Sequence, residues 1–521
     1  MSKFNIFKAR PAHGRGPITT TGPDVTHEGA PGHARDVKGE LFMLAVSNMV
    51  GEDTFYESAD QRDNRFAQLV AAVAMDDVAW LTRFVTWLRT EGNMRSAPLV
   101  AAAEAVHARL AAGRVGDNRG LIDAALNRAD EPGELLAYWH RRFGRALPKP
   151  VKRGLGDAAL RLYAEYPLLK YDTGSKGVRF ADVLSLAHPA GRRGGQWKDD
   201  LFRYAIDRRR GRDTAPPETL TMVRANTELR ELAGGDPQAM LDADRLRAAG
   251  MTWEDVLSLV GSKLPKAKLW EALIPSMGIM ALARNLRNFD EASVPDSAVA
   301  QVIARLTDPA QVAKSRMFPF RWLSAYEAAP SPRWAHALDQ ALQASLSNLP
   351  ALPGRTLVLV DTSASMTTVS RKARSKATPL KAAAVFGVAL AAKGEAVDLV
   401  GFADGVFTHQ VGKGASVIQE VDRFVKRSGE VGHGTEIASS VRATYAGHDR
   451  VVIVSDMQAM GPDVTTSVPE STMMYGFNLR GYRVAALDTS RPNRVELGGL
   501  TDATFRMMPL IEAGRDAAWP F

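Results

Sequence analysis

The stretch TLVLVDTSASMTT (356–368) joins an apolar run to a cluster of oxygen-bearing side chains. The run Thr-Leu-Val-Leu-Val has the length and the branched residues of a strand buried on both faces. It leads directly into Asp361, Ser363 and Ser365, which are spaced two residues apart. This D-x-S-x-S pattern presents hard oxygen donors from one loop, and such donors suit Mg²⁺ or another divalent cation that keeps bound water.

Similar apolar runs follow this one along the chain. AVDLVGFAD, RVVIVSD and RVAALD each end in Asp, and stretches with helical patterns separate them. Strand–helix alternation of this kind predicts a parallel, doubly wound sheet covered on both faces. We therefore expect a Rossmann-like α/β domain over 351–521, beginning after the Pro/Gly hinge LPALPGR (349–355).

Two further metal ligands are expected from neighbouring loops, because ligands of open α/β sheets bind at the carboxyl ends of the strands. Thr435 follows a Gly-rich turn in GHGTEIASS, and Asp456 ends RVVIVSD. The alternative is that Asp361, Ser363 and Thr435 only cap helix N-termini. The ordered motifs resemble the von Willebrand factor A domain with its metal-ion-dependent adhesion site. Glu436 departs from that family's pattern, in which Asp is common.

The N-terminal two-thirds of the chain has a different texture. Residues 1–37 are rich in Gly, Pro, Thr and His without periodicity, which predicts a flexible tail. Over 38–350, apolar residues recur at i, i+3, i+4 and i+7, for example in APLVAAAEAVHARLAAG (97–113). Many helices joined by short loops predict an all-α domain of antiparallel pairs stacked as a solenoid.

Composition narrows the function. The net charge is +8, and 141–212 alone holds 18 Lys and Arg against 7 Asp and Glu. A local basic block points to a polyanion such as nucleic acid, although a solvated Arg-rich surface is the alternative. The absence of Cys excludes disulfides, thiol catalysis and Cys-based zinc sites. Without a long apolar run or a secretory signal, we expect a cytoplasmic protein that neither spans nor contacts a membrane.

Four segments resemble, in order and spacing, the TROVE module of the Ro autoantigen family: FGRALPKPVKRGLGD, LLKYDTGSKGVRFADVLSLAHP, WEALIPSMGIMALARNLRNF and SRMFPFRWLSAYEA. Ro proteins carry a von Willebrand A domain after the same junction, so the resemblance covers roughly 38–521 and suggests a bacterial member. It implies a ring of HEAT-like helical repeats over 38–350.

The resemblance also implies a function. Ro proteins bind small noncoding Y RNA on a basic outer surface and the single-stranded 3′ ends of misfolded RNA in a central hole. Bacterial relatives are similar to adaptors for RNA-processing enzymes such as the exoribonuclease polynucleotide phosphorylase. We thus expect a monomeric RNA-binding scaffold in RNA quality control, not an enzyme. A metal-dependent protein-interaction scaffold without specific RNA binding is the alternative, and a metal-dependent nuclease a weaker one.

The candidate RNA-binding residues are predicted on different grounds. Lys170 and His188 match a lysine and a histidine of the family, whereas Arg179 lies between them without a positional match. The others share the basic segment or ALARNLRNF, where a structural Arg–Asn pair is an equal alternative. The full set is Lys170, His188, Arg179, Arg142, Arg145, Lys149, Lys152, Arg153, Arg192, Arg193, Arg284 and Arg287.

Overall fold

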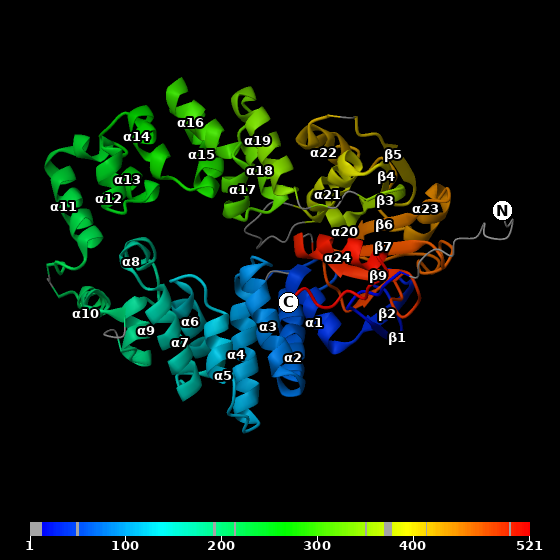
Figure 1. Cartoon of the computed structure of the whole chain (residues 1–521), viewed down its shortest axis with the longest axis horizontal. Helices are drawn as coiled ribbons and strands as arrows, with labels where there is room; N and C mark the ends of the chain where they lie inside the picture. The colour runs from blue at the N-terminus through cyan, green and yellow to red at the C-terminus, as the bar shows by residue number, and fades with distance from the viewer. Residues whose placement is uncertain are drawn as a thin grey trace, which may run out of the picture. The chain divides into compact units, whose positions relative to one another are not determined.

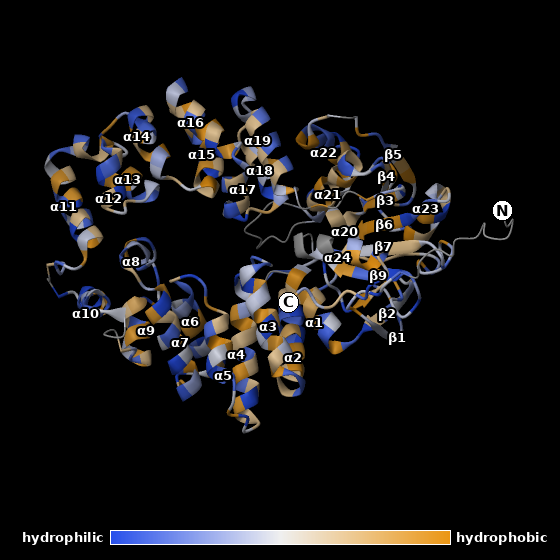
Figure 2. Ribbon diagram, viewed as in Figure 1, coloured by the Kyte–Doolittle hydropathy of each residue, from blue (hydrophilic) through white to orange (hydrophobic). Residues whose placement is uncertain are grey.

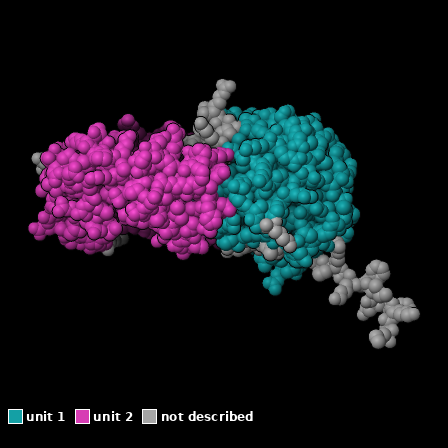
Figure 3. Space-filling view, turned by 90° about the horizontal axis from the view of Figure 1, so that it is seen from above, with its two compact units in different colours: residues 1–72, 318–323, 342–521 teal, residues 73–317, 324–341 magenta. Residues whose placement is uncertain are grey.

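The computed structural model describes residues 13–47, 52–190, 194–212, 215–347, 349, 352–368, 378–412, 414–499 and 502–521. The chain separates into two compact units, which Figure 3 colours. Unit 1 comprises Met1–Ala72, Phe318–Leu323 and Leu342–Phe521, and unit 2 comprises Val73–Met317 and Ser324–Ala341. Arg192 and Arg193, two of the predicted RNA-binding residues, lie outside the described residues.

Unit 1 is built on the predicted α/β domain (Figure 1). Its six-stranded sheet has the order β5-β4-β3-β6-β7-β9 and is parallel except for the β4–β5 pair. The strands are β3 (Arg355–Asp361), β4 (Ala396–Phe402), β5 (Val406–His409), β6 (Arg450–Ser455), β7 (Met473–Asn478) and β9 (Arg494–Gly498). The connecting helices are α20 (Ala364–Thr367), α21 (Pro379–Lys393), α22 (Val417–Val425), α23 (Ile437–Thr444) and α24 (Asp502–Glu512).

The central strand β3 is buried on both faces, as its continuous apolar run predicts. Leu357 and Leu359 join a core cluster with Val441 of α23. Val358 and Val360 point the other way, because a Cβ on Gly387 of α21 would lie within 4 Å of both. The alternation of side chains along a strand thus gives each face its own apolar layer.

The sequence prediction for the later strands is wrong in one respect. RVAALD contributes only the two-residue strand β8 (Val484–Ala485), which belongs to a separate three-stranded sheet. The outer parallel strands are instead MMYGFN and RVELG, which contain Gly and charged residues. The buried carboxylate of Glu496 in β9 interrupts the apolar pattern by which a buried strand is found.

The predicted flexible tail also needs correction, because its described part is ordered. Strand β1 (Thr20–Val25) pairs with β2 (Pro31–Arg35), and β2 pairs with β8. The Arg35 guanidinium forms a fully buried ion pair with Glu496 of β9, at 2.6 Å from both carboxylate oxygens. A buried charge pair of this kind fixes the hairpin on the α/β domain.

The helical region begins in unit 1. Helices α1 (Val37–Ser47) and α2 (Ala59–Asp76) come before most of unit 2, and α1 packs against β9. A Cβ on Gly498 of β9 would lie 2.5 Å from Met43 Sδ, so glycine permits this close approach. The boundaries 1–37, 38–350 and 351–521 therefore do not coincide with the compact units.

Unit 2 is all-helical, as predicted, and its helices pack mainly against near neighbours in the chain. Blue and orange alternate along these helices in Figure 2, as expected for amphipathic elements. The helices of this region are α3 (Val78–Thr90), α4 (Ser96–Ala111), α5 (Asn118–Ala124), α6 (Glu131–Phe143), α7 (Lys149–Leu162), α8 (Glu165–Tyr171), α9 (Phe180–Ala187), α10 (Gln196–Arg209), α11 (Thr221–Gly235), α12 (Ala243–Ala248), α13 (Trp253–Val260), α14 (Lys266–Leu273), α15 (Ile279–Glu291), α16 (Asp296–Leu306), α17 (Pro309–Ser315), α18 (Pro319–Ala328) and α19 (Pro332–Ser345). The last two of them, α18 and α19, are shared with unit 1.

The two ends of unit 2 are in contact. Arg316, just after α17, donates from Nη1 to the carbonyl of Thr90 at the end of α3, at 2.8 Å. Asn93 Nδ2 donates in return to the Arg316 carbonyl, also at 2.8 Å. These reciprocal bonds join the end of α3, the first helix given for unit 2, to the segment after α17, near its other end, which agrees with a closed helical repeat. Within the described residues, no helix is both long and apolar enough to span a membrane.

Candidate metal site and RNA-binding surface

The five predicted metal ligands lie on loops at the carboxyl edge of the sheet. Asp361 ends β3, and Ser363 and Ser365 follow in the next turn. Thr435 precedes α23, and Asp456 directly follows β6, the neighbour of β3. All five side chains are buried, each at 2% exposure or less. The prediction that these loops meet at one edge agrees with this placement.

Backbone hydrogen bonds hold the loops together. Ala364 N donates to the His433 carbonyl at 3.0 Å, and Met460 N donates to the Thr435 carbonyl at 2.9 Å. The Asp404 carboxylate, after β4, accepts from His433 N at 2.8 Å and Gly434 N at 3.0 Å. These bonds position the Thr435 loop between the other two. Asp404 ends one of the apolar runs quoted above, yet its role was not predicted.

Glycine is required in the turn before Thr435. Gly432 has a φ of +91°, and a Cβ there would lie 1.8 Å from Asp404 Oδ2. A Cβ on Gly434 would lie 2.0 Å from Asp404 Oδ1. Only glycine allows the backbone to approach the carboxylate this closely, which gives a physical reason for the sequence GHG.

The donor set fits a divalent cation. Asp361 accepts hydrogen bonds from Ser363 N at 2.8 Å and from Ser455 Oγ at 2.5 Å. Asp456 Oδ1 accepts from Gln458 N at 3.1 Å, whereas Asp456 Oδ2 is buried without a hydrogen-bond partner in the part of the chain that the structure describes. A buried carboxylate oxygen left unpaired is costly, and a cation would satisfy it. In the described part of the chain, no group of three or more His, Cys, Asp or Glu side chains could hold a metal, so a cation site here needs hydroxyl ligands.

Burial also perturbs the two carboxyl groups. Loss of solvent raises the pKa of Asp361 above its ordinary value, against the effect of the hydrogen bonds from Ser455 and Ser363. Loss of solvent likewise raises the pKa of Asp456, and the neighbouring Asp361 carboxylate raises it further. Because burial and mutual repulsion oppose the ionisation of both carboxyl groups, a cation bound between them would stabilise their charged forms.

The capping alternative explains less of the site. The Ser363 side chain makes no capping hydrogen bond at the start of α20, and the residue at the N-cap of α23 is Glu436 rather than Thr435. Asp361 does accept one backbone N–H. The Glu436 side chain turns to the helix, where its Oε2 accepts from Ser439 Oγ at 2.9 Å. Glu436, whose side chain is longer than that of the Asp common in the family, therefore bonds to a residue of its own helix.

Residues of the N-terminal segment also approach this edge, which the sequence prediction missed. Thr26 Oγ1 donates to the Ala459 carbonyl at 2.7 Å, and His27 N donates to Gln458 Oε1 at 2.9 Å. The His27 ring stacks on Tyr56 with centroids 4.9 Å apart. Burial, a hydrogen bond to Glu28 and the Asp456 carboxylate all raise the pKa of Tyr56. No sequence pattern in the first 37 residues predicts that Thr26 and His27 lie at the sheet edge.

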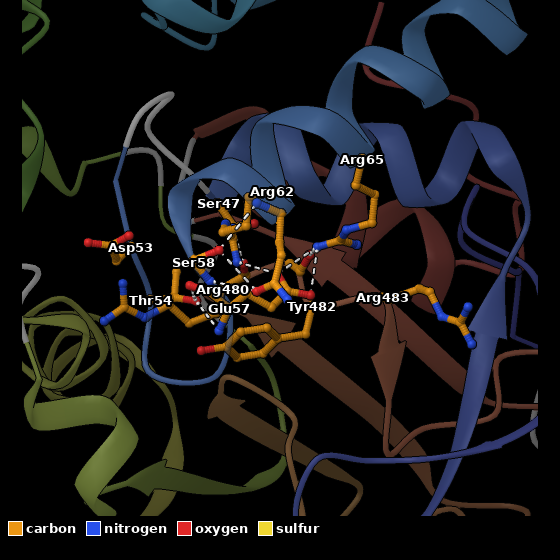
Figure 4. Close-up of polar contacts among 12 residues, drawn as sticks. Ser47, Asp53, Thr54, Glu57, Ser58, Arg62, Arg65, Arg480, Tyr482 and Arg483 are labelled. Atoms are coloured by element: carbon orange, nitrogen blue, oxygen red, sulfur yellow. Dashed lines mark hydrogen bonds and ion pairs between the residues drawn. The ribbon is translucent and has the colours of Figure 1, made fainter.

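A buried arginine network connects helix α2 to the same region (Figure 4). Arg62 is fully buried, and it donates to the Arg480 carbonyl at 2.6 Å and to Glu57 Oε2 at 3.1 Å. Arg480 Nη2 in turn donates to the Thr368 carbonyl at 2.8 Å, three residues beyond Ser365. The network thus links α2 to the loop that carries the D-x-S-x-S motif.

Apart from Lys170, the predicted RNA-binding cations that the structure describes in unit 2 fall into two groups. In the first group the charge is used within the protein. Arg179 bonds the buried Asp172 carboxylate at 2.6 Å, and Arg142 bonds Glu104 at 2.9 Å. Arg287 pairs with Glu291 on the exposed surface of α15 at 2.8 Å. The Arg179 side chain is only 11% exposed and serves the fold through this pair, and its contact with RNA stays a prediction.

In the second group the cation makes no hydrogen bond or ion pair with any described residue. Most of its members lie around the start of α7, and one lies on α15, where the neighbouring Asn285 is a buried structural residue. These side chains are exposed or half-buried, and they are available to a ligand. They are Arg145, Lys149, Lys152, Arg153 and Arg284.

Lys170 and His188 are both exposed. The Lys170 ammonium lies 5.5 Å and 5.4 Å from the ring centroids of Tyr166 and Tyr171, within cation–π range. His188 ends α9 in the left-handed conformation, with a φ of +47°, and its N–H donates to the Leu184 carbonyl. The backbone of His188 thus ends the helix, while its ring stays accessible.

Comparison with known proteins bears on these assignments. Residues 245–332 match the model of the TROVE domain. A 78-residue stretch is 40% identical to telomerase protein component 1 of Mus musculus; it covers 15% of this chain and spans only 3% of that relative. The crystal structure of the Ro (Rsr) protein of Deinococcus radiodurans superposes with a TM-score of 0.61, at 20% identity, covering 91% of this chain and 100% of that one.

These similarities confirm the predicted resemblance to the Ro family and the predicted fold class. The structural likeness extends over nearly the whole chain, so both the helical repeat and the α/β domain have counterparts in that fold. The family-model match lies between α12 and the start of α19. It does not include the basic segment or the metal site.

Proposed function

Since the chain contains a TROVE segment and has the fold of a Ro protein, we propose that it is an RNA-binding protein of the Ro type. Its ligands would be small noncoding Y RNA and the single-stranded 3′ ends of misfolded RNA. It would act in the cytoplasm as a monomeric adaptor that presents RNA to an exoribonuclease such as polynucleotide phosphorylase. Resemblance to TROVE proteins suggests the RNA-binding class, and the particular RNA and enzyme are part of the proposal.

The observation that carries the proposal is the group of exposed cations in unit 2 that have no partner among the described residues. Arg145, Lys149 and Arg153 are exposed within a segment of strong positive excess. Arginines that serve the fold are paired with carboxylates, as Arg179 is with Asp172. Cations left unpaired are the groups that bind phosphates and release counterions.

A binding titration tests the proposal. Purified protein is titrated against a stem-loop RNA with a single-stranded 3′ tail, with duplex RNA and DNA of equal charge in parallel, across a salt series. Preference for the tailed RNA that persists at moderate salt supports recognition beyond phosphate attraction. Equal, steeply salt-dependent binding of all three contradicts it and favours the protein-interaction scaffold.

We further propose that a divalent cation, Mg²⁺ in the first instance, occupies the carboxyl edge of unit 1. Asp361, Ser363, Ser365, Thr435 and Asp456 would hold it, and the unpaired Asp456 Oδ2 supports this assignment. When bound, the cation would offer an open position to an acidic group of the protein or of a partner. Two carboxylates and three hydroxyls differ from the several carboxylates that hold two ions in nucleases, so we expect no catalysis. RNA incubated with the purified protein should stay intact.

A further inference from the structure

Unit 2 carries a groove whose lining includes residues outside the predicted RNA-binding set. The groove has a volume of about 660 Å³ and is lined by the start of α3, the start of α5 with the loop before it, and the first turns of α7. Helix α5 contacts both α3 and α7, so the three elements form one packed wall. Volumes of this order accommodate ligands of a few hundred daltons.

Four cations line the groove. Arg83 comes from α3, Arg119 from α5, and Lys149 and Arg153 from α7. Asp117 is the one carboxylate among the described lining residues. Lys149 and Arg153 are four residues apart on a helix, so their side chains lie on the same face. The groove therefore gathers charge from parts of the chain as far apart as residues 83 and 153.

Most of this charge has no protein counterpart. Arg119 is held by Asp157, at 2.5 Å and 2.7 Å. The side chains of Arg83, Lys149 and Arg153 make no hydrogen bond or ion pair with any residue of the described chain, and all three residues are exposed. Three like charges around one hollow repel each other, and an anionic ligand would relieve that repulsion.

We infer that this groove binds the sugar–phosphate backbone of the RNA, with phosphates held by Arg83, Lys149 and Arg153. The inference rests on the proposed RNA-binding function and extends it to helix α3, which lies outside the basic segment 141–212. Arginine offers phosphate a planar, donor-rich partner, and lysine offers a compact charge. The exposed Val115 at the rim, which is 82% exposed, gives an apolar surface against which a ribose can lie.

The test compares two triple variants with equal loss of charge. R83A/K149A/R153A removes the unpaired cations of the groove. R423A/K426A/R442A removes three exposed cations of unit 1, from α22, from the residue that follows it and from α23. Affinity for the tailed stem-loop RNA is measured across a salt series, with polyglutamate of equal charge as a second ligand and melting temperature as the check on folding.

The groove variant should bind the RNA about 30-fold more weakly, and its log–log salt slope should be shallower by about 2, because each phosphate contact contributes roughly 0.7 to 0.9. The control variant should stay within about 3-fold of the unaltered protein. Equal affinities and slopes for the two variants would overturn the groove assignment. A selective loss of polyglutamate binding would overturn it in favour of an acidic peptide.

Asp117 supplies a test of opposite sign. Asp117→Asn removes the negative charge of the groove, and Asn accepts the left-handed backbone that this position has, at a φ of +63°. RNA should bind about 2-fold to 3-fold more tightly, and weaker or unchanged binding would count against the groove. If the unaltered protein shows no preference for the tailed RNA, the proposed function itself fails. If the unaltered protein prefers the tailed RNA but the groove variant binds it equally well, only the groove inference is rejected.

Discussion

The carboxyl edge of the α/β sheet and the basic helical segment were both predicted from residue type and position, but the two predictions had different outcomes. At the sheet edge, all five predicted side chains are buried on adjoining loops. In the helical segment, the predicted cations that the structure describes divide into exposed groups without a described partner and groups already paired with carboxylates. Strand ends determine where a side chain lies, whereas charge on a helix does not determine what it contacts.

The largest expected effect concerns Arg179, a predicted RNA-binding residue that pairs with a buried carboxylate. Arg179→Ala should lower the free energy of unfolding by about 3 kcal/mol, because it leaves the buried Asp172 carboxylate without its charged partner. Urea unfolding followed by circular dichroism measures this change, with Asp172→Asn/Arg179→Ala as the partly compensated control. RNA affinity of the folded variant should stay within about 2-fold. Weaker RNA binding at unchanged stability would show that Arg179 contacts RNA and does not serve the fold.

The second effect concerns the sheet edge. Mg²⁺ at about 100 times its dissociation constant should stabilise the protein by about 2.7 kcal/mol and raise the melting temperature by a few degrees. Asp361→Asn should abolish this rise. Glu436→Gln is the matched control, since Glu436 bonds Ser439 and should leave the response intact. The metal assignment is wrong if the unaltered protein shows no rise.

The third effect concerns the two positions matched to the family. Lys170→Ala and His188→Asn should each weaken binding of structured RNA about 10-fold, or about 1.4 kcal/mol. Asn keeps the left-handed backbone of residue 188, so the melting temperature should not change. Gel-shift titration measures the affinity. Unchanged binding in both variants removes these residues from the RNA site.

The fourth effect is a pH dependence at the sheet edge. Burial raises the pKa of Asp361 and Asp456, so without metal the folded state holds protons that the unfolded state has released. Their contribution to stability is present below pH 4 and is lost as the pH rises through the folded pKa values. In EDTA, the melting temperature of the unaltered protein should therefore fall between pH 5 and 8 more than that of Asp361→Asn.

Added Mg²⁺ should offset this fall, because a cation replaces the bound protons. The stabilisation by Mg²⁺ should consequently be larger at pH 8 than at pH 5.5. Melting curves in paired EDTA and Mg²⁺ buffers measure both trends. A metal response that grows toward low pH would contradict the assignment of these carboxylates as ligands.

The smallest effect concerns Arg287. Arg287→Ala should change the free energy of unfolding by less than about 0.5 kcal/mol, because its pair with Glu291 is an exposed i,i+4 contact. Its RNA affinity should change less than 2-fold, since the guanidinium already has an acidic partner. Arg284→Ala, three residues earlier and without a partner, is the comparison. A larger loss of RNA affinity in Arg287→Ala than in Arg284→Ala would show that the absence of an acidic partner does not identify the arginines that contact RNA.

How far the fold could be predicted varied with the strand. TLVLV (356–360) reads as a buried strand because both faces are apolar. RVELG (494–498) does not, since its Glu496 becomes a core residue only when Arg35 arrives from the other end of the chain. RVAALD has the apolar pattern, but its neighbour in space is the N-terminal hairpin and not the main sheet. Local pattern is insufficient where a distant segment supplies the pairing group.

The sequence by itself determined the two-part architecture and the position of the candidate metal ligands at the sheet edge. Periodicity gives the elements, and parallel strands bring their carboxyl ends to one edge, so D-x-S-x-S, Thr435 and Asp456 needed no further information. Tertiary structure alone decided which arginines are neutralised, where the N-terminal hairpin lies, and that Arg83 faces the cations of α7 across a groove. The reason is physical: the alternation of side chains is a local property, whereas the pairing of a charge depends on which carboxylates folding brings within reach.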